Sequence, residues 1–348
     1  MTNTSFHKDF KLQGKSFSTV YELLSFTKKS FDDDVYEFLN VWFSSKDNIV
    51  VQTSGSTGVP KPILLKKEYV RNSAIATGKF FKTYAKTKAL LCLSPVYIAG
   101  KLMLVRALTL GWHLDIIQPI SNPLEKLKSD YDFCAMVPLQ LENSIPFLSK
   151  IKQLIVGGGV VSEALIQKFK SSSCSVFATY GMTETITHIA VKKLNNYTLQ
   201  PQFYKVLANV KIYKDSRNCL IIDAPRISSD IVITNDVVEL ISDKEFRWLG
   251  RYDNVINSGA IKLYPEKIEE KLAQVINERF FVAGKPDTYL GEKLILIIEG
   301  KQRKIDFNDI LLTKYEVPKT IFFIDKFVET PTQKIQRKKT LNLIFKAV

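Results

Sequence analysis

Apolar residues recur every three or four positions in two adjacent stretches near the N-terminus. This spacing places them on one face of a helix. Asp32, Asp33 and Asp34 stand between the stretches and supply an N-cap and first-turn acids for the second helix. The pattern predicts two amphipathic helices within residues 16–45, with apolar faces formed by Val20, Leu23, Leu24 and Phe31 and by Val35, Phe38, Leu39 and Trp42.

Strand-like apolar runs alternate with helical patterns over the next part of the chain. Strands are predicted at residues 48–52, 89–93, 114–118, 133–137, 153–156 and 175–178, and helices at 67–84, 101–110 and 162–170, with Ser162 as the N-cap of the last. This alternation predicts an α/β sheet. Ligands of such sheets bind beyond the carboxyl ends of strands, so the loops after residues 52, 156 and 178 are candidate site loops.

The pattern changes after about residue 195, where shorter strand-like runs follow one another without helices. Runs at 210–213, 219–223, 231–234 and 237–241 predict an antiparallel region, and the polar stretch 249–254 predicts a turn. Pro265 then opens a predicted helix, followed by strands at 280–283, 294–298 and 320–324. We therefore expect an α/β protein with a large N-terminal domain of βα sheets (1–250), a hinge (251–254) and a small, mobile C-terminal α+β domain (255–348).

Composition narrows the function classes. The chain has 348 residues, 45% of them hydrophobic, and its four cysteines are scattered, which argues against a zinc site or a disulfide framework. The sequence contains no GxSxG elbow, so a Ser-His-Asp triad is not suggested. The formal net charge of +14 is spread along the chain, so anionic small substrates are its simplest functional interpretation. Without a signal-peptide pattern or a long apolar run, we expect a cytoplasmic protein with no membrane insertion.

A loop rich in hydroxyl groups and glycines follows the first predicted strand. Successive backbone N–H groups in such a loop, joined by hydroxyls and a lysine, form a nest for phosphate oxygens. Pro60 and Pro62 exclude a Walker A loop, which needs GxxxxGK[ST] at the start of a helix. The residues predicted to bind phosphate are Thr53, Ser54, Gly55, Ser56, Thr57, Gly58 and Lys61.

A second polar segment, Tyr180-Gly181-Met182-Thr183-Glu184-Thr185, follows the strand predicted at 175–178. Glu184 is the only acid between Glu163 and Asp215, and one carboxylate beside hydroxyls suits Mg²⁺, which takes one or two carboxylates plus phosphate. The alternative is that Glu184 is an ordinary exposed glutamate of a loop, as most glutamates are.

The loop at 53–61 and the segment at 180–185 together resemble the signatures of the acyl-adenylate-forming (AMP-binding) superfamily, which includes the acyl-CoA synthetases. Further matches follow in the family's order: Gly157-Gly158-Gly159, Thr234-Asn235-Asp236, Gly250-Arg251-Tyr252-Asp253 and residues 330–337, TPTQKIQR. Asn235 and Gln333 stand where the family usually has glycine. Only 52 residues precede Thr53, fewer than is usual, so we expect a compact version truncated at the front.

The resemblance implies an enzyme that uses ATP, Mg²⁺ and CoA. It assigns Glu184 and Lys334 as catalytic residues, with Glu184 also as the metal ligand. It implies that Asp253 is the hinge and that Gly259 serves the CoA step. Besides the loop at 53–61, it assigns ATP or AMP binding to Gly158, Gly159, Tyr180, Gly181, Met182, Thr183, Asp236 and Arg251.

Two cations on the apolar helix predicted at 101–110 bear on the acid that is activated. Arg106 either snorkels or meets an anion, and a guanidinium grips a carboxylate with two hydrogen bonds. The segment resembles the o-succinylbenzoate–CoA ligase family of menaquinone biosynthesis, in which a matching arginine reads the aromatic carboxylate. The acyl-substrate residues implied are Tyr97, Lys101, Arg106 and Gly157, with Tyr97 standing where that family usually has histidine.

Two alternatives stay open from the sequence. One is a ligase for another aryl or aliphatic acid. The other is a non-catalytic nucleotide-binding or nucleic-acid-binding protein, suggested by the basic charge and by Asn235 and Gln333. Nucleic acid is not the expected partner, because no nucleic-acid module is recognisable, and the sequence leaves homo-oligomer formation open.

Overall fold

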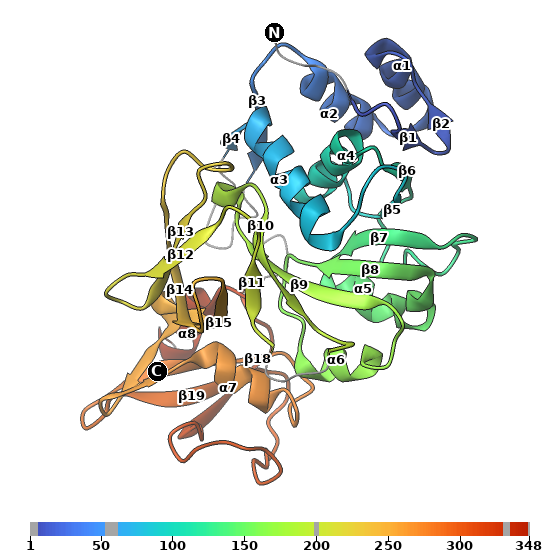
Figure 1. Cartoon of the computed structure of the whole chain (residues 1–348). Coiled ribbons are helices and arrows are strands. Elements are labelled where there is room, and N and C mark those ends of the chain that lie inside the picture. Colours follow the sequence, from blue (N-terminus) through green and yellow to red (C-terminus); the bar gives the residue numbers. More distant parts are fainter. Residues whose placement is uncertain (1–5, 53–61, 198–201, 330–334, 347–348) are drawn as a thin grey trace.

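A computed structural model describes residues 6–52, 62–197, 202–329 and 335–346 of the chain (Figure 1). Thirteen strands form one large sheet in the order β12-β13-β14-β15-β11-β10-β9-β8-β7-β5-β6-β1-β2. One half of this sheet is parallel and confirms the predicted α/β class. Its central strands are β5 (Lys88–Leu91), β6 (His113–Ile116), β7 (Tyr131–Met136), β8 (Ile151–Val156) and β9 (Ser175–Gly181).

Alternate side chains of the parallel strands enter two separate cores, one on each face of the sheet. In β7, Phe133 and Ala135 belong to one core, and Cys134 and Met136 to the other. Helices α3 (Lys67–Phe81) and α4 (Ile98–Leu110) contribute to the first core, and α5 (Pro138–Ser144) and α6 (Glu163–Phe169) to the second. Ser162 caps α6 as predicted, since its hydroxyl accepts a hydrogen bond from the Leu165 N–H.

The N-terminal part confirms the two predicted helices, α1 (Val20–Ser30) and α2 (Asp33–Phe43). Asp32 occupies the N-cap position of α2, but its side chain makes no capping hydrogen bond there. A short hairpin, β1 (Lys11–Leu12) and β2 (Lys15–Ser16), extends the large sheet. Strands β3 (Asn48–Gln52) and β4 (Pro62–Lys66) form a separate two-stranded sheet that pairs Gln52 with Pro62.

The other half of the large sheet is antiparallel, as predicted, and begins where β9 pairs with β10. The separate runs predicted at 231–234 and 237–241 are wrong, because the structure has one strand there, β14. Asp236 stays in the ladder opposite Arg251, so the polar residues do not interrupt the strand. The antiparallel strands are β10 (His188–Lys193), β11 (Tyr204–Val206), β12 (Lys211–Lys214), β13 (Cys219–Asp223), β14 (Val232–Leu240) and β15 (Glu245–Arg251).

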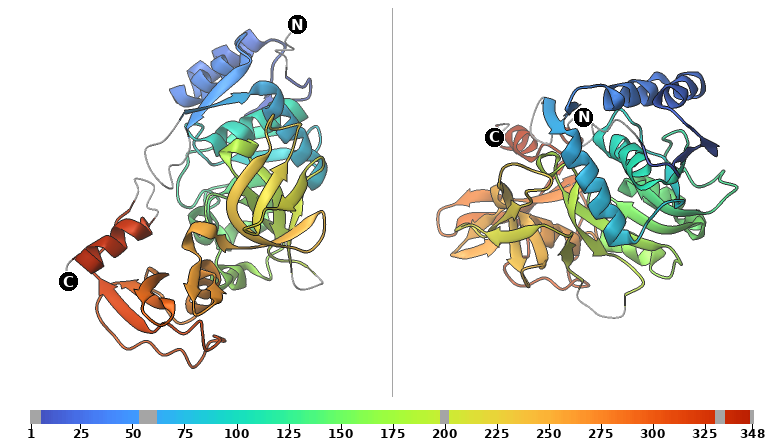
Figure 2. Two further views of the ribbon diagram at one scale, coloured as in Figure 1. Left: turned by 90° about the vertical axis from the view of Figure 1, so that its left-hand side faces the viewer. Right: turned by 45° about the horizontal axis from the view of Figure 1, so that its top comes forward.

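A second, five-stranded sheet follows and confirms the small α+β region. It lies at the opposite end of the molecule from α1 and α2 (Figure 2). Helix α7 (Pro265–Leu272) begins with Pro265 as predicted, and α8 (Arg337–Lys346) is the last helix of the described chain. No helix in the described ranges has the length and apolarity needed to cross a bilayer. The strands are β16 (Ile256–Ser258), β17 (Ile261–Leu263), β18 (Phe280–Asp287), β19 (Gly291–Glu299) and β20 (Thr320–Ile324).

The chain passes from one sheet to the other at residues 252–255. The turn predicted at 249–254 is shorter in the structure, because residues 249–251 still belong to β15 and only a 3-10 helix, η3 (Tyr252–Asn254), follows. Asn254 ties η3 to α7 by donating to Glu266 Oε1 at 2.6 Å. The domain boundary predicted at 251–254 stays a prediction.

Asn235 bridges this junction to the large sheet. Its Nδ2 donates to Asp253 Oδ2 at 3.3 Å, and its Oδ1 accepts from Arg217 Nη1 at 2.9 Å. Arg217 is itself held by Asp215, with Nη2 2.7 Å from Oδ2. Glycine, usual at position 235 in the family that the sequence resembles, has no side chain to make this connection.

We expect Asn235→Ala to loosen the junction without unfolding the protein. A neutral hydrogen bond contributes about 1 kcal/mol, so amide exchange over residues 252–255 should become roughly five-fold faster. Hydrogen–deuterium exchange with mass spectrometry measures this. Asn72→Ala is the matched control, because it removes a side-chain bond to Arg226 O elsewhere. Unchanged exchange at 252–255 in Asn235→Ala would show that the bridge does not hold the junction.

Candidate active site

Several of the predicted site residues follow strands that end at one edge of the large sheet. Strands β7, β8 and β9 are parallel neighbours, so their carboxyl ends lie side by side. Gly157, Gly158 and Gly159 follow β8 directly. A Cβ on Gly157 would come within 2.7 Å of Thr179 Oγ1 on β9, and Gly158 has a φ of +79°, a conformation that favours glycine. Gly157 therefore lets the start of this loop lie close to β9.

The end of β9 turns sharply back into β10 through the 3-10 helix η2 (Thr183–Thr185). Gly181 lies so close to the backbone of Thr187 and His188 that a Cβ would clash with it. The buried Thr185 hydroxyl lies 2.8 Å from Thr187 O and accepts from the Met182 N–H at 3.1 Å. This fixed turn leaves Glu184 exposed, with no hydrogen bond or ion pair to its carboxylate from the described residues.

Asp236 is the most fully bonded carboxylate of the candidate site. It is 6% exposed, and its Oδ2 accepts from the Tyr180 hydroxyl at 2.6 Å, while Oδ1 accepts from Trp248 Nε1 at 3.2 Å. Arg251, opposite Asp236 in the ladder, places Nη1 3.6 Å from Oδ1. Burial, and then the Asp236 charge, raise the pKa of Tyr180 above its usual range, so its phenol stays a donor. The structure thus brings together Tyr180, Asp236 and Arg251, which the sequence predicted separately.

Arg106, unlike Asp236, is a buried charge with few bonding partners. It is 3% exposed, and burial lowers its pKa to about 10. Its Nη2 donates to Thr187 Oγ1 at 3.4 Å, whereas Nε has no partner among the described residues. Within the described ranges, no carboxylate forms an ion pair with this guanidinium. A buried cation without a counter-charge is costly, which makes it a candidate anion-binding group.

The other two polar residues predicted for the acyl substrate lie elsewhere around α4. Tyr97, at the N-cap position, is 66% exposed. Lys101 faces α2, with its Nζ 5.9 Å from the centre of the Phe38 ring, and burial lowers its pKa while Asp34 opposes this shift. The structure therefore does not bring Lys101 and Arg106 together, because they lie on different sides of the helix.

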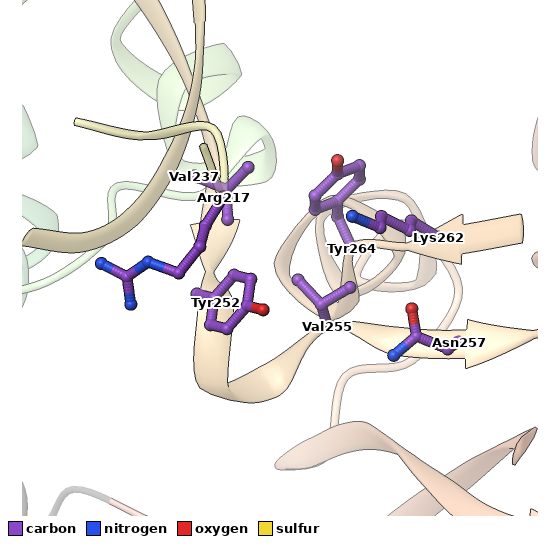
Figure 3. A pocket seen from close by; sticks show the side chains of 7 residues that line it. All are labelled: Arg217, Val237, Tyr252, Val255, Asn257, Lys262 and Tyr264. Carbon is purple, nitrogen blue, oxygen red and sulfur yellow. The ribbon is translucent and has the colours of Figure 1, made fainter. Parts of the chain in front are cut away.

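Asp253 and Gly259, predicted for the hinge and the CoA step, lie at and beyond the junction. Gly259 has a φ of +55° in the turn between β16 and β17, and its N–H donates to Leu290 O at 2.8 Å. A pocket of about 200 Å³ lies beside the junction. Figure 3 shows Arg217 and Tyr252 on one side of it and Lys262 and Tyr264 on the other. Arg217 stacks over Tyr252 and is paired with Asp215, so its charge is already satisfied.

Two parts of the predicted site lie outside the described residues. They are the catalytic Lys334 and the phosphate loop with Thr53, Ser54, Gly55, Ser56, Thr57, Gly58 and Lys61.

Sequence reasoning missed three side chains that contact the predicted site residues. Trp248 donates to Asp236, Thr187 accepts from Arg106, and the buried His188 lies beside both Thr187 and Arg106. A usable signal existed for His188, because it is one of only three histidines and comes three residues after the segment 180–185.

The sequence profile of the AMP-binding enzyme family matches residues 9–218, more than half of the chain. A solved relative from Dyadobacter fermentans, described as an acyl-CoA synthetase (AMP-forming)/AMP-acid ligase II-like protein, is 36% identical. The match covers 89% of this chain and 93% of that one, with a TM-score of 0.61.

More distant relatives carry a more specific name. The 2-succinylbenzoate–CoA ligase of Lactococcus lactis is 23% identical over 316 residues, covering 84% of this chain and 70% of that protein. That of Listeria monocytogenes is 25% identical over 350 residues, covering 88% and 72%. The Bacillus subtilis O-succinylbenzoate coenzyme A synthetase, solved in complex with ATP and magnesium ion, has the same fold, with a TM-score of 0.73 and 17% identity over 93% of this chain and 82% of that one. The chain belongs to the AMP-binding enzyme family and is an AMP-forming acyl-CoA synthetase.

Proposed function

We propose that this ligase activates 2-succinylbenzoate, or a close aromatic dicarboxylate, with ATP and transfers the acyl group to CoA. The observation that carries the proposal is Arg106, a buried guanidinium with an unpartnered Nε and no described counter-ion. The names of the more distant relatives support the same substrate.

The argument from Arg106 is one of charge balance. A guanidinium removed from water loses its hydration, and a carboxylate that makes two hydrogen bonds to it restores the balance. The acid to be activated must keep one carboxylate free for reaction, so an acid that also satisfies Arg106 carries two. In 2-succinylbenzoate, the aromatic carboxylate would meet Arg106 and the succinyl carboxylate would react.

The reaction then has two steps. An oxygen of the succinyl carboxylate attacks the α-phosphorus of ATP, the bond to the bridging oxygen breaks, and pyrophosphate leaves. The CoA thiolate next attacks the carbonyl carbon of the acyl-adenylate, and AMP leaves. We assign the departing phosphates to the loop at 53–61, the growing negative charge to Lys334, and the ribose hydroxyls to Asp236 and Arg251.

Glu184 fits the demands of a magnesium ion bound mainly through ATP. Its carboxylate is exposed at the sheet edge and has no described partner. No group of three metal-ligating side chains occurs in the part of the chain that the structure describes. Mg²⁺ usually keeps several waters and uses one or two carboxylates plus phosphates. When bound, the ion would neutralise phosphate charge.

For the second step, we propose that the chain beyond residue 254 turns about Asp253. This motion would remove Lys334 from the adenylate and bring the turn at Gly259 toward it. The connection of only four residues between β15 and β16 supports this proposal.

The first test is pyrophosphate release from the purified protein with Mg-ATP and a panel of acids, with and without CoA. We expect release with 2-succinylbenzoate and a thioester product only when CoA is added. Release with a different aryl or aliphatic acid would support the second candidate, a ligase for that acid. The exposed Tyr97, which replaces the histidine usual in the 2-succinylbenzoate ligases, favours that candidate. No release with any acid would contradict both.

The second test is Arg106→Leu. Hydrogen bonds to charged groups contribute about 1.5–3 kcal/mol, so KM for 2-succinylbenzoate should rise roughly 10- to 100-fold. KM for the analogue that lacks the aromatic carboxylate should change far less. Arg106→Lys, which keeps the charge but loses the planar fork, is the matched control and should fall between wild type and Arg106→Leu. An equal rise in KM for both acids would refute carboxylate recognition by Arg106.

A further inference from the structure

Four polar side chains connect α4 to α3, three of them buried (Arg106, His188 and Thr77) and one half-buried (Thr187, just before β10). Arg106 Nη2 lies 3.4 Å from Thr187 Oγ1, which lies 3.5 Å from His188 Nδ1. His188 Nε2 lies 3.3 Å from Thr77 Oγ1, and the Thr77 hydroxyl donates to Ser73 O at 3.0 Å. The connection therefore ends on a backbone carbonyl of α3.

The direction of each hydrogen bond follows from the bond that Thr77 Oγ1 donates to Ser73 O. The Thr77 hydroxyl gives its only proton to Ser73 O, so it can only accept from His188. His188 must then carry a proton on Nε2. A neutral ring has no proton left on Nδ1, so Nδ1 accepts from the Thr187 hydroxyl. Thr187, with its proton engaged, presents lone pairs to Arg106, which can only donate.

The charge of His188 agrees with this assignment. Burial, and then the charge of Arg106, hold the pKa of His188 well below its usual value, so the ring is neutral near pH 7. Phe81, also from α3, packs edge-on against the ring with centroids 6.5 Å apart. His188 therefore adds neither a second cation nor a counter-charge beside Arg106.

We propose that Thr77 and His188 are positioning residues for acid recognition: they fix the Thr187 hydroxyl as an acceptor, and this acceptor holds the Arg106 guanidinium. The remaining donors of the guanidinium are thereby left for the second carboxylate of the substrate. The identity of this ligand rests on the proposed function, whereas the direction of the hydrogen bonds along the four side chains does not. Because the Thr187 hydroxyl already donates its proton to His188, it has none left to donate to the substrate, and it serves only as an acceptor for Arg106.

A matched pair of substitutions at Thr77 tests the proposal. Thr77→Val keeps the shape and removes the acceptor for His188, whereas Thr77→Ser keeps the hydroxyl. For Thr77→Val, KM for 2-succinylbenzoate should rise about three- to ten-fold, with kcat within about two-fold of wild type and little change for the analogue that lacks the aromatic carboxylate. Thr77→Ser should restore the wild-type KM. Equal KM values for the two Thr77 variants would overturn the inference. If Arg106→Leu still raised KM for the dicarboxylate far more than KM for the analogue, the proposed function would stand.

A measurement on the folded wild-type protein is independent of catalysis and of variant stability. The chain has only three histidines, so ring ¹⁵N spectra of histidine-labelled protein contain few signals, and His188→Gln identifies one of them by its loss. We expect this ring to be neutral with its proton on Nε2. A proton on Nδ1, or a charged ring at pH 7, would overturn the inference whatever substrate the enzyme uses. If Arg106→Leu raises KM equally for both acids while the Nε2–H form is observed, the proposed function fails and the direction of the hydrogen bonds stands.

Discussion

The turn from β9 into β10 is the constraint on which the candidate site depends. At this point the large sheet changes from parallel to antiparallel pairing, so the chain must reverse within the few residues of η2. The reversal exposes Glu184 at the sheet edge and returns Thr187 and His188 to the interior beside α3 and α4. Gly181 is required because only a residue without Cβ allows β10 to approach so closely. A single turn therefore supplies Glu184 to the proposed nucleotide end of the site and Thr187 and His188 to the proposed acid end.

The two buried charges of the candidate site, Asp236 and Arg106, differ in how far hydrogen bonds and opposite charges stabilise them. Asp236 accepts hydrogen bonds from Tyr180 and Trp248 and lies near Arg251, so its charge is stabilised before any ligand binds. Within the part of the chain that the structure describes, Arg106 has one long hydrogen bond, to a neutral hydroxyl. A preorganised carboxylate suits a neutral group such as the ribose hydroxyls. An undercompensated cation suits an anion, and under the proposed function its incomplete bonding in the free protein would be a source of selectivity.

The sequence predicted the parallel half of the fold well, because buried strands and amphipathic helices leave periodic apolar patterns. It predicted the site residues as separate segments, since each follows a strand or a polar turn. The break predicted at 235–236 was wrong, because composition alone does not reveal that a buried aspartate can stay in a ladder when neighbouring strands supply donors. Strands β10, β11 and β15–β17 were missed for a similar reason. Their stability comes from cross-strand pairing, which the composition of a single strand does not show. The orientation of Lys101 away from Arg106 was likewise decided by packing against α2.

The hydrogen-bonded connection from Arg106 to Ser73 draws its members from three segments that lie far apart in the sequence. The cation comes from α4, the hydroxyl from the residue just before β10, the imidazole from the first residue of β10, and the terminal acceptors from α3. If Arg106 recognises the acid as proposed, acid selectivity would depend on α3 and β10 as well as on α4. Grafting α4 from a relative that lacks this arginine would leave Thr187, His188 and Thr77 behind without their fourth member. Changes of acid selectivity in this lineage should therefore involve correlated substitutions on α3 and β10, and a helix exchange alone would trade selectivity for instability.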